Sequence, residues 1–254
     1  MRGLYHPIVR YLILSDIHAN WEALVAVLAH ARSEYDRILC CGDVVGYGAD
    51  PDAVTEWVRD NVAHVVRGNH DKACAGLEDL EWFNPVARLS ALWTMEIMDE
   101  ENLAYLRDLT RGPEQIDGFQ ILHGSPLDED EYVVSEQDVA QIAPYLDSAT
   151  SFFGHTHLQG GFLCHRNGVK RLAGVRAGMD AETLELEPDT SYLINPGSVG
   201  QPRDGDPRSA YGVYEPEAHL VTLYRVEYDI GAAQKKILEA GLPELLALRL
   251  NAGI

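Results

Sequence analysis

The sequence predicts an α/β protein, built as two packed sheets with helices on the outside, in a single domain over residues 1–254. Three observations predict this class. A length of 254 residues is enough for one large domain with a buried core. Strand, loop and helix patterns alternate through the first half of the chain, which indicates a parallel sheet. Strand and turn patterns dominate the second half, which indicates antiparallel pairing.

The first half alternates strands with helices. Residues 9–14 form a continuous apolar run, as expected for a strand buried on both faces. A helix with apolar periodicity follows from about residue 21 to residue 32, and Asn20 is suited to cap it. Pro51 is typical of the first turn of a second helix. Two further strands are expected, at residues 37–41 and 63–66, so that a βαβαβ unit with right-handed crossovers results.

The second half shows helix and turn signals between short strands. Helices are expected from Asn84-Pro85 to residue 98, after a Ser135 cap to about residue 146, and over residues 230–250 with a break near 241–243. Asp117-Gly118 and Asn167-Gly168 predict tight turns of hairpins. Strands are expected at residues 119–122, 150–153, 191–194, 211–214 and 220–226.

The charge balance excludes some classes of partner. The chain has 20 basic and 40 acidic residues, a net charge of −20. Nucleic acid and anionic membranes carry the same sign, so we expect no nonspecific binding to either. No apolar run approaches the roughly 18 residues of a membrane helix, and residues 1–11 lack the apolar stretch of a signal peptide. We expect a cytoplasmic protein with reduced cysteines, and a homodimer is compatible with the sequence.

Polar residues that bind metal ions follow the predicted strands. In open α/β sheets these segments line the ligand crevice at the carboxyl ends of the strands. An Asp-x-His or His-x-His spacing places both side chains on one side of an extended segment. The candidate ligands are Asp16, His18, Asp43, Asn69, His123, His155 and His157.

This set of donors favours two divalent metal ions. Carboxylates, imidazoles and an amide oxygen, with no thiolate, suit Mn²⁺, Fe, Zn²⁺ or Co²⁺, of which we take Mn²⁺ as the first choice. Seven ligands are too many for one tetrahedral site, and a pair of metals is typical of displacement at phosphorus. Each residue taken singly is explained equally well by capping or loop hydrogen bonds.

The motifs DxH, GD, GNHD, HG and GHTH, in this order, resemble those of the calcineurin-like metallophosphoesterases. The NPGSVGQPR segment is most similar to the small bacterial and archaeal members. The resemblance implies a four-layer α/β/β/α sandwich and two metal sites bridged by Asp43. It implies that Asp16, His18 and His157 hold one ion, that Asn69, His123 and His155 hold the other, and that His70 is the catalytic histidine beside the scissile phosphate.

One motif departs from part of this family. The serine/threonine phosphatases carry an Asp-Arg pair after the GD motif, where this chain has Gly46 and Tyr47. The partner of His70 is therefore expected elsewhere, and protein phosphatase activity is disfavoured. Positive charge for phosphate is expected from Arg203 or Arg208 in the 201–208 segment. Asn20 and Tyr47 are further candidates for substrate contacts, although helix capping explains Asn20 fully.

We therefore expect a metal-dependent hydrolase that cleaves phosphate esters by in-line attack of a metal-bridging hydroxide at phosphorus. A phosphodiester is the first choice, because the loop after Asp43 has no arginine to hold a doubly charged monoester. Hydrolysis of phosphomonoesters or of dinucleoside polyphosphates is the alternative, so the substrate is a small phosphorylated molecule, with nucleotides as one option. A noncatalytic scaffold of the same fold is the alternative from another class.

Overall fold

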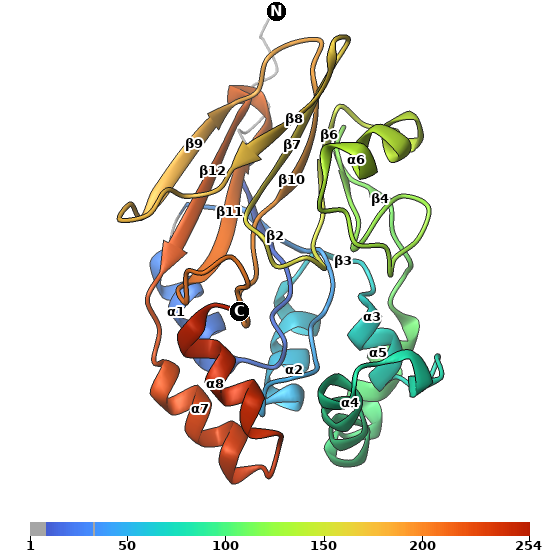
Figure 1. The fold of residues 1–254 in the computed structure, drawn as a ribbon, viewed down its shortest axis with the longest axis vertical. Coiled ribbons are helices and arrows are strands. Elements are labelled where there is room, and N and C mark those ends of the chain that lie inside the picture. Colours follow the sequence, from blue (N-terminus) through green and yellow to red (C-terminus); the bar gives the residue numbers. More distant parts are fainter. Residues whose placement is uncertain (1–8, 33) are drawn as a thin grey trace, which may run out of the picture.

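The computed structural model describes residues 9–32 and 34–254 and contains two six-stranded mixed sheets with helices on their outer sides (Figure 1). Residues 1–8, part of the segment expected to lack a signal sequence, lie outside the described residues. The two mixed sheets with outer helices confirm the predicted fold class. Among the helices of the described ranges, none is long and apolar enough to cross a bilayer.

The first sheet combines the N-terminal strands with strands from the C-terminal third. Its order is β3-β2-β1-β11-β12-β9, and only β1–β2 and β2–β3 pair in parallel. The parallel βαβαβ unit is therefore confirmed, but β11, β12 and β9 complete its sheet by antiparallel pairing. The bounds are β1 Tyr11–Leu14, β2 Arg37–Cys40, β3 His64–Val65, β9 Ala181–Glu185, β11 Ser209–Glu215 and β12 Leu220–Val226.

The second sheet has the order β4-β5-β6-β10-β7-β8 and contains both hairpins that the turn residues predict. Asp117-Gly118 joins β4 to β5, and Asn167-Gly168 joins β7 to β8. Strands β5, β6 and β10 pair in parallel. The bounds are β4 Glu114–Gln115, β5 Gln120–Ile121, β6 Thr150–Phe152, β7 Gly160–His165, β8 Gly168–Ala173 and β10 Ser191–Asn195.

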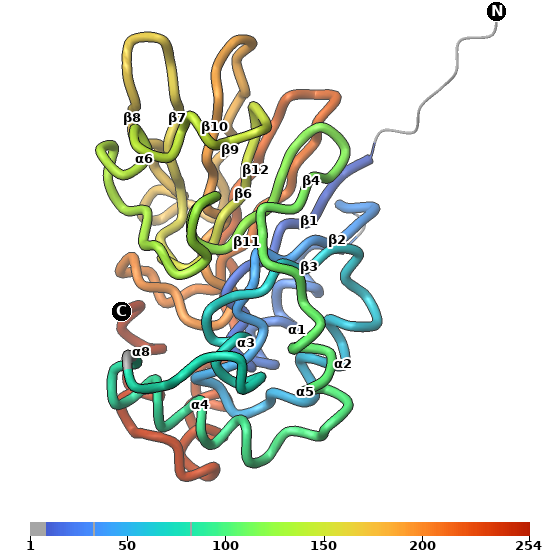
Figure 2. The backbone as a smooth tube through the Cα atoms, turned by 90° about the vertical axis from the view of Figure 1, so that its right-hand side faces the viewer, coloured from blue at the N-terminus to red at the C-terminus, as the bar shows by residue number. Residues whose placement is uncertain are grey.

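The helices flank the sheets on both outer sides. Helix α1 packs on β11 and β12, and α6 packs on the β7–β8 hairpin (Figure 2). The Asn20 side chain caps α1 by accepting from the Ala23 N–H (3.1 Å), as predicted. The bounds are α1 Trp21–His30, α2 Pro51–Asn61, α3 Asn69–Cys74, α4 Pro85–Ile97, α5 Glu100–Asp108, α6 Glu136–Ile142, α7 Ile230–Glu239 and α8 Glu244–Ala252.

Apolar side chains fill the space between the sheets and the space beneath the helices. In β1, Tyr11 and Ile13 face the second sheet, where Tyr11 contacts Phe119 (ring centroids 4.9 Å apart), whereas Leu12 and Leu14 face the helices. Because neighbouring side chains of a strand point to opposite faces, a strand buried on both sides must be apolar throughout. This explains the continuous apolar run in β1.

Candidate metal centre

Two groups of ligand-type side chains lie together at the ends of β1, β2, β5 and β6. Within each group, one ligand atom per residue lies within 4.8 Å of all the others. Asp43 belongs to both groups, and its Oδ2 lies 3.5 Å from Nε2 of His18 and 3.5 Å from Nε2 of His123. The groups are Asp16, His18, Asp43 and His157, and Asp43, His123 and His155.

Asn69 joins the second group as the first residue of α3. Its Oδ1 lies 3.2 Å from Nε2 of His123. The structure thus brings together all seven residues that the motifs single out as ligands. The six histidines and aspartates of the two groups are almost fully buried, so their charges are shielded from water.

Backbone hydrogen bonds fix which ring nitrogen each histidine directs at the cluster. Nδ1 of His18 donates to the Val45 carbonyl (3.0 Å), and Nδ1 of His123 donates to that of Cys41 (2.8 Å). Nδ1 of His157 donates to the Gln201 carbonyl (2.6 Å). In the neutral form of each ring Nε2 then carries no proton and is available to a metal.

His155 has the opposite orientation. Its Nε2 donates to the backbone carbonyl of Asp130 (3.1 Å), which leaves Nδ1 to act as the ligand atom. A metal-binding histidine commonly donates its second ring nitrogen to such an oxygen. All four imidazoles therefore have the arrangement of metal ligands.

The ligand segments are held in the left-handed backbone region, which non-glycine residues rarely adopt. The φ angles are 52° for Asp16, 49° for His18, 56° for Asp43, 65° for His155 and 59° for His157. Each such residue costs about 1–3 kcal/mol and persists only where its surroundings impose it. Ala19 and Tyr47, in the same segments, share this conformation, and of the described non-glycine residues only Asp189 and His219 adopt it elsewhere. The strain is thus concentrated at the cluster.

Asp71 imposes the conformation at Asp43, a role that the motif analysis missed. Its carboxylate accepts from the backbone N–H groups of Asp43 (2.9 Å), Val44 (2.8 Å), Val45 (3.1 Å) and Gly68 (3.0 Å). The bond from the Gly68 N–H lies at the start of α3, where Asp71 is in the first turn. Since no helix was predicted at this motif, the sequence analysis did not predict this bond. The three bonds to the Asp43 loop depend on tertiary packing.

The electrostatics of the cluster fit divalent cations. Burial raises the pKa of Asp16 to about 7 and lowers the pKa of His155 to about 3. Burial also opposes ionisation of Asp43, but His123, His70 and His18 outweigh it and hold its pKa well below the usual range. Burial alone would lower the pKa of His123, but the Asp43 charge raises it to about 10. Cations bound here would replace protons as the compensating charge.

His70 lies beside the cluster with its ring packed among other rings. Its centroid is 5.0 Å from that of His18, 4.3 Å from Tyr47 and 5.4 Å from Phe83. Nδ1 is buried and has no hydrogen-bond partner, so the partner expected from elsewhere in the chain is missing among the described residues. The backbone of Gly46 instead lies against Nδ1 of His70, so close that a Cβ on residue 46 would be 2.6 Å from this nitrogen.

The candidate substrate residues have different positions. The Tyr47 ring packs at a tilt against those of His18 and His70, and its hydroxyl accepts from Nη2 of Arg203 (3.3 Å). Nε of Arg203 is buried and unpaired, which leaves it able to bind an anion. Arg208 is instead held by Asp206 and Asp180. Asn20 makes structural contacts only, to Ala23, Gly200 and Tyr228.

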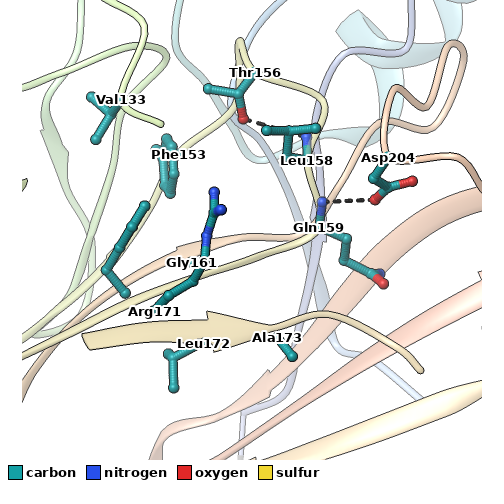
Figure 3. A pocket seen from close by; sticks show the side chains of 11 residues that line it. Val133, Phe153, Thr156, Leu158, Gln159, Gly161, Arg171, Leu172, Ala173 and Asp204 are labelled. Atoms are coloured by element: carbon teal, nitrogen blue, oxygen red, sulfur yellow. Dashed lines mark hydrogen bonds between the residues drawn. The ribbon is translucent and has the colours of Figure 1, made fainter. Parts of the chain in front are cut away.

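Two cavities lie near these residues. One, of about 360 Å³, is bounded by Asn69, His70 and His155 at the cluster. The other, of about 240 Å³, lies behind the turn that carries His155 and His157 and is lined by Thr156 (Figure 3). None of the seven candidate ligands lines the second cavity. The first cavity is therefore the one that opens onto the cluster.

Comparison with known proteins identifies relatives along the whole chain. Residues 9–218 match the calcineurin-like phosphoesterase superfamily domain. An uncharacterized protein of Methanocaldococcus jannaschii is 36% identical over 253 residues, which covers 95% of this chain and 97% of that protein. The crystal structure of a metallophosphoesterase from Sphaerobacter thermophilus is 42% identical, with a TM-score of 0.84 and coverage of 97% and 99% of the two chains.

A more distant structure shares the fold. A hypothetical protein from Pyrococcus horikoshii has a TM-score of 0.76 at 20% identity, with coverage of 97% of this chain and 99% of that one. The fold of the present chain is thus shared by a protein whose sequence differs from it at most positions.

Proposed function

The chain belongs to the calcineurin-like phosphoesterase superfamily, and from this premise we propose that it is a phosphodiesterase that depends on two divalent metal ions. The observation that carries the proposal is the position of Asp43 in both ligand groups. A carboxylate shared by two groups of buried imidazoles and carboxylates is suited to bridging two cations. The substrate is then a small phosphorylated molecule.

The two ions would be held by separate sets of residues. Asp16, His18 and His157 would hold one, and Asn69, His123 and His155 the other, with Asp43 shared; Mn²⁺ is our first choice. Bound there, divalent ions supply Lewis-acid polarisation of the phosphate ester and activation of water.

Residues of the chain hold the phosphate and move a proton. Arg203 offers the buried, unpaired Nε of a half-buried guanidinium to a phosphate oxygen. As the oxygen of water bonds to phosphorus, the water releases a proton to solvent, the bond to the leaving oxygen breaks, and the leaving oxygen takes a proton. Burial lowers the pKa of His70 to about 4, so its ring is neutral in the empty site. A bound phosphate anion favours the protonated ring, which would donate the proton from Nε2, because Nδ1 is enclosed against Gly46.

Arg203 also favours a second candidate function. The preference for a diester rests on the absence of an arginine after Asp43, but Arg203 brings a guanidinium to Tyr47 from another segment. A phosphomonoesterase is therefore the alternative that one structural contact supports. The two activities differ in the charge that the site must neutralise, so substrate preference separates them.

Hydrolysis of bis-p-nitrophenyl phosphate, compared with p-nitrophenyl phosphate, tests the proposal. The protein is stripped of metal and restored with Mn²⁺, and the variants His70→Ala and Asp43→Asn are measured beside it. We expect diester turnover that requires metal and is lost in both variants. A preference for the monoester would favour the alternative. Absence of turnover of both esters, together with sites that bind no metal, would contradict the enzyme assignment.

A further inference from the structure

The cavity of about 360 Å³ beside the cluster is lined by ligand, aromatic and acidic residues. Asn69, His70 and His155 form the end at the cluster, where the proposed function places the scissile phosphate. One ester group of that phosphate then extends toward the remaining walls. The volume is at the small end of the range of about 300–1,000 Å³ that small-molecule pockets span, so the cavity holds one compact group.

Aromatic rings from three separate segments line the cavity. Tyr47 precedes α2, Phe83 precedes α4, and Tyr132 lies between β5 and α6. Each contacts a site imidazole: Tyr47 and Phe83 contact His70, and the Tyr132 ring lies 3.9 Å from that of His155. Aromatic walls offer offset or edge contacts to another flat ring. The ester group that fits best is therefore aromatic.

Part of the cavity wall is acidic. Glu78 and Asp130 line it, and both are paired with Lys72, at 3.1 Å and 2.5 Å. Glu129 also contacts Lys72, at 3.4 Å, and is paired with Arg67 at 2.8 Å, so three carboxylates face two cations.

Arg203 contacts Tyr47 and Tyr132 from behind the aromatic side chains, but it does not itself line the cavity. Among the described residues that line the cavity there is no lysine or arginine. The acidic wall thus carries excess negative charge and accepts hydrogen bonds. It repels any anionic group that the substrate carries besides the scissile phosphate.

Building on the proposed function, we propose that this cavity binds the leaving group and selects an aromatic group without negative charge. Hydroxyl or amino donors on that group can hydrogen-bond to Glu78 and Asp130. Leaving groups that carry a carboxylate or further phosphates are excluded, because Glu78 and Asp130 repel them. The substrate class is thus an aryl or nucleoside ester with one phosphate, and dinucleoside polyphosphates are disfavoured.

Two diesters that differ by one charge test this inference. Methyl 4-nitrophenyl phosphate has a neutral ring, whereas methyl 3-carboxy-4-nitrophenyl phosphate carries a carboxylate on the same leaving group. We expect kcat/KM of the Mn²⁺-loaded protein to favour the neutral ester by about tenfold or more, since like charges meet in a partly dry pocket. In the double variant Glu78→Gln/Asp130→Asn this ratio falls toward one, and the ratio rather than either rate is the readout.

A matched double variant serves as the control. Glu81→Gln/Glu131→Gln removes the same charge from the same two segments, but neither residue lines the cavity. It is expected to keep the wild-type ratio, and thermal unfolding verifies that both double variants fold. Equal kcat/KM for the two esters in the wild type overturns the inference and leaves the proposed function intact. If neither diester is cleaved, the proposed phosphodiesterase function is wrong, and this inference falls with it.

Discussion

Residue 46 must be glycine for two reasons, its backbone conformation and the closeness of the His70 ring. Its φ of +87° is unfavourable for any residue with a side chain, and a Cβ would lie 2.6 Å from Nδ1 of His70. Gly118, in the turn between β4 and β5, has a φ of +88° but open space around it. A substitution at Gly118 therefore introduces backbone strain alone, whereas a substitution at Gly46 introduces the same strain and also displaces His70.

We predict that Gly46→Ala and Gly118→Ala both lower the free energy of unfolding by about 1–2 kcal/mol, since both force alanine into the left-handed region. Only Gly46→Ala should also lower kcat, by about a hundredfold, because it displaces His70. Urea unfolding and turnover of the preferred p-nitrophenyl ester measure the two effects. Equal kcat in the two variants would show that the position of His70 is unimportant.

Substitution of Asp71 should disturb the position of the ligand Asp43 without removing any metal ligand. In Asp71→Asn the amide nitrogen cannot accept, so two of four buried N–H groups lose their partner, at a cost of about 2–4 kcal/mol. Activity should fall about 10–100-fold, as for other supports of metal ligands. Asp138→Asn is the control, because Asp138 accepts from Val134 and Ser135 in a capping box of α6. Loss of activity in both variants would contradict a specific role for Asp71.

For individual residues of the site, the sequence predicted which residues take part better than it predicted their contacts. Asp16, His18 and Asp43 were predicted as ligands because polar groups at strand ends meet at one edge of a sheet, and the structure brings them together. The missing partner of His70 and the four bonds of Asp71 depend on how residues 43–46 pack against α3. Spacing along the chain carries no information on such packing.

The segment between β5 and α6 is held over the cavity by Lys72 of α3. In Lys72→Met, Glu78, Glu129 and Asp130 lose a shared cation, so we predict that amide hydrogen exchange in residues 128–132 accelerates by about tenfold, which corresponds to 1.4 kcal/mol. Lys235→Met is the control, because Lys235 forms only an exposed pair with Glu239 at 3.7 Å. Unchanged exchange in Lys72→Met would mean that backbone contacts fix this segment.

Most elements with strong periodicity or clear caps were predicted from the sequence, and so were the short strands β3 and β5, whereas helix α5 and the edge strand β9 were not. Helix α4 spans Pro85–Ile97, as the Asn84-Pro85 signal predicts. Strand β9 was missed because Ala181–Glu185 lies at a sheet edge, pairs on one side only and has few apolar residues. The GNHD motif was expected in a loop, but Asn69 and His70 begin the six-residue helix α3. So short a helix gives no periodic signal.

For the whole molecule, metal binding should contribute to stability. Free metal at a hundred times its dissociation constant stabilises the folded state by about 2.7 kcal/mol. We predict that removal of metal lowers Tm by roughly 5–10 °C, as measured by calorimetry before and after chelation, and that Mn²⁺ restores it. Asp43→Asn should show a much smaller response. A wild-type Tm that is independent of metal would contradict the metal centre.

The sheet order was the part of the whole fold least accessible from sequence. Two packed sheets were expected from the change in pattern between the halves of the chain, and they are present. Local signals did not reveal that β11 pairs with β1. Pairing between segments so distant in sequence is decided by the packing of both faces of the sheet.

The pairing of β1 with β11 has a consequence for synthesis on the ribosome. The register aligns Tyr11 with Tyr214, so β1 leaves the exit tunnel long before its neighbour is translated. At about 5–20 residues per second, the nascent chain waits roughly 10–40 s with one edge of β1 uncovered. An uncovered edge strand is a template for wrong pairing. The interval before residues 209–226 emerge is therefore the stage of synthesis at which β1 is most exposed to wrong pairing.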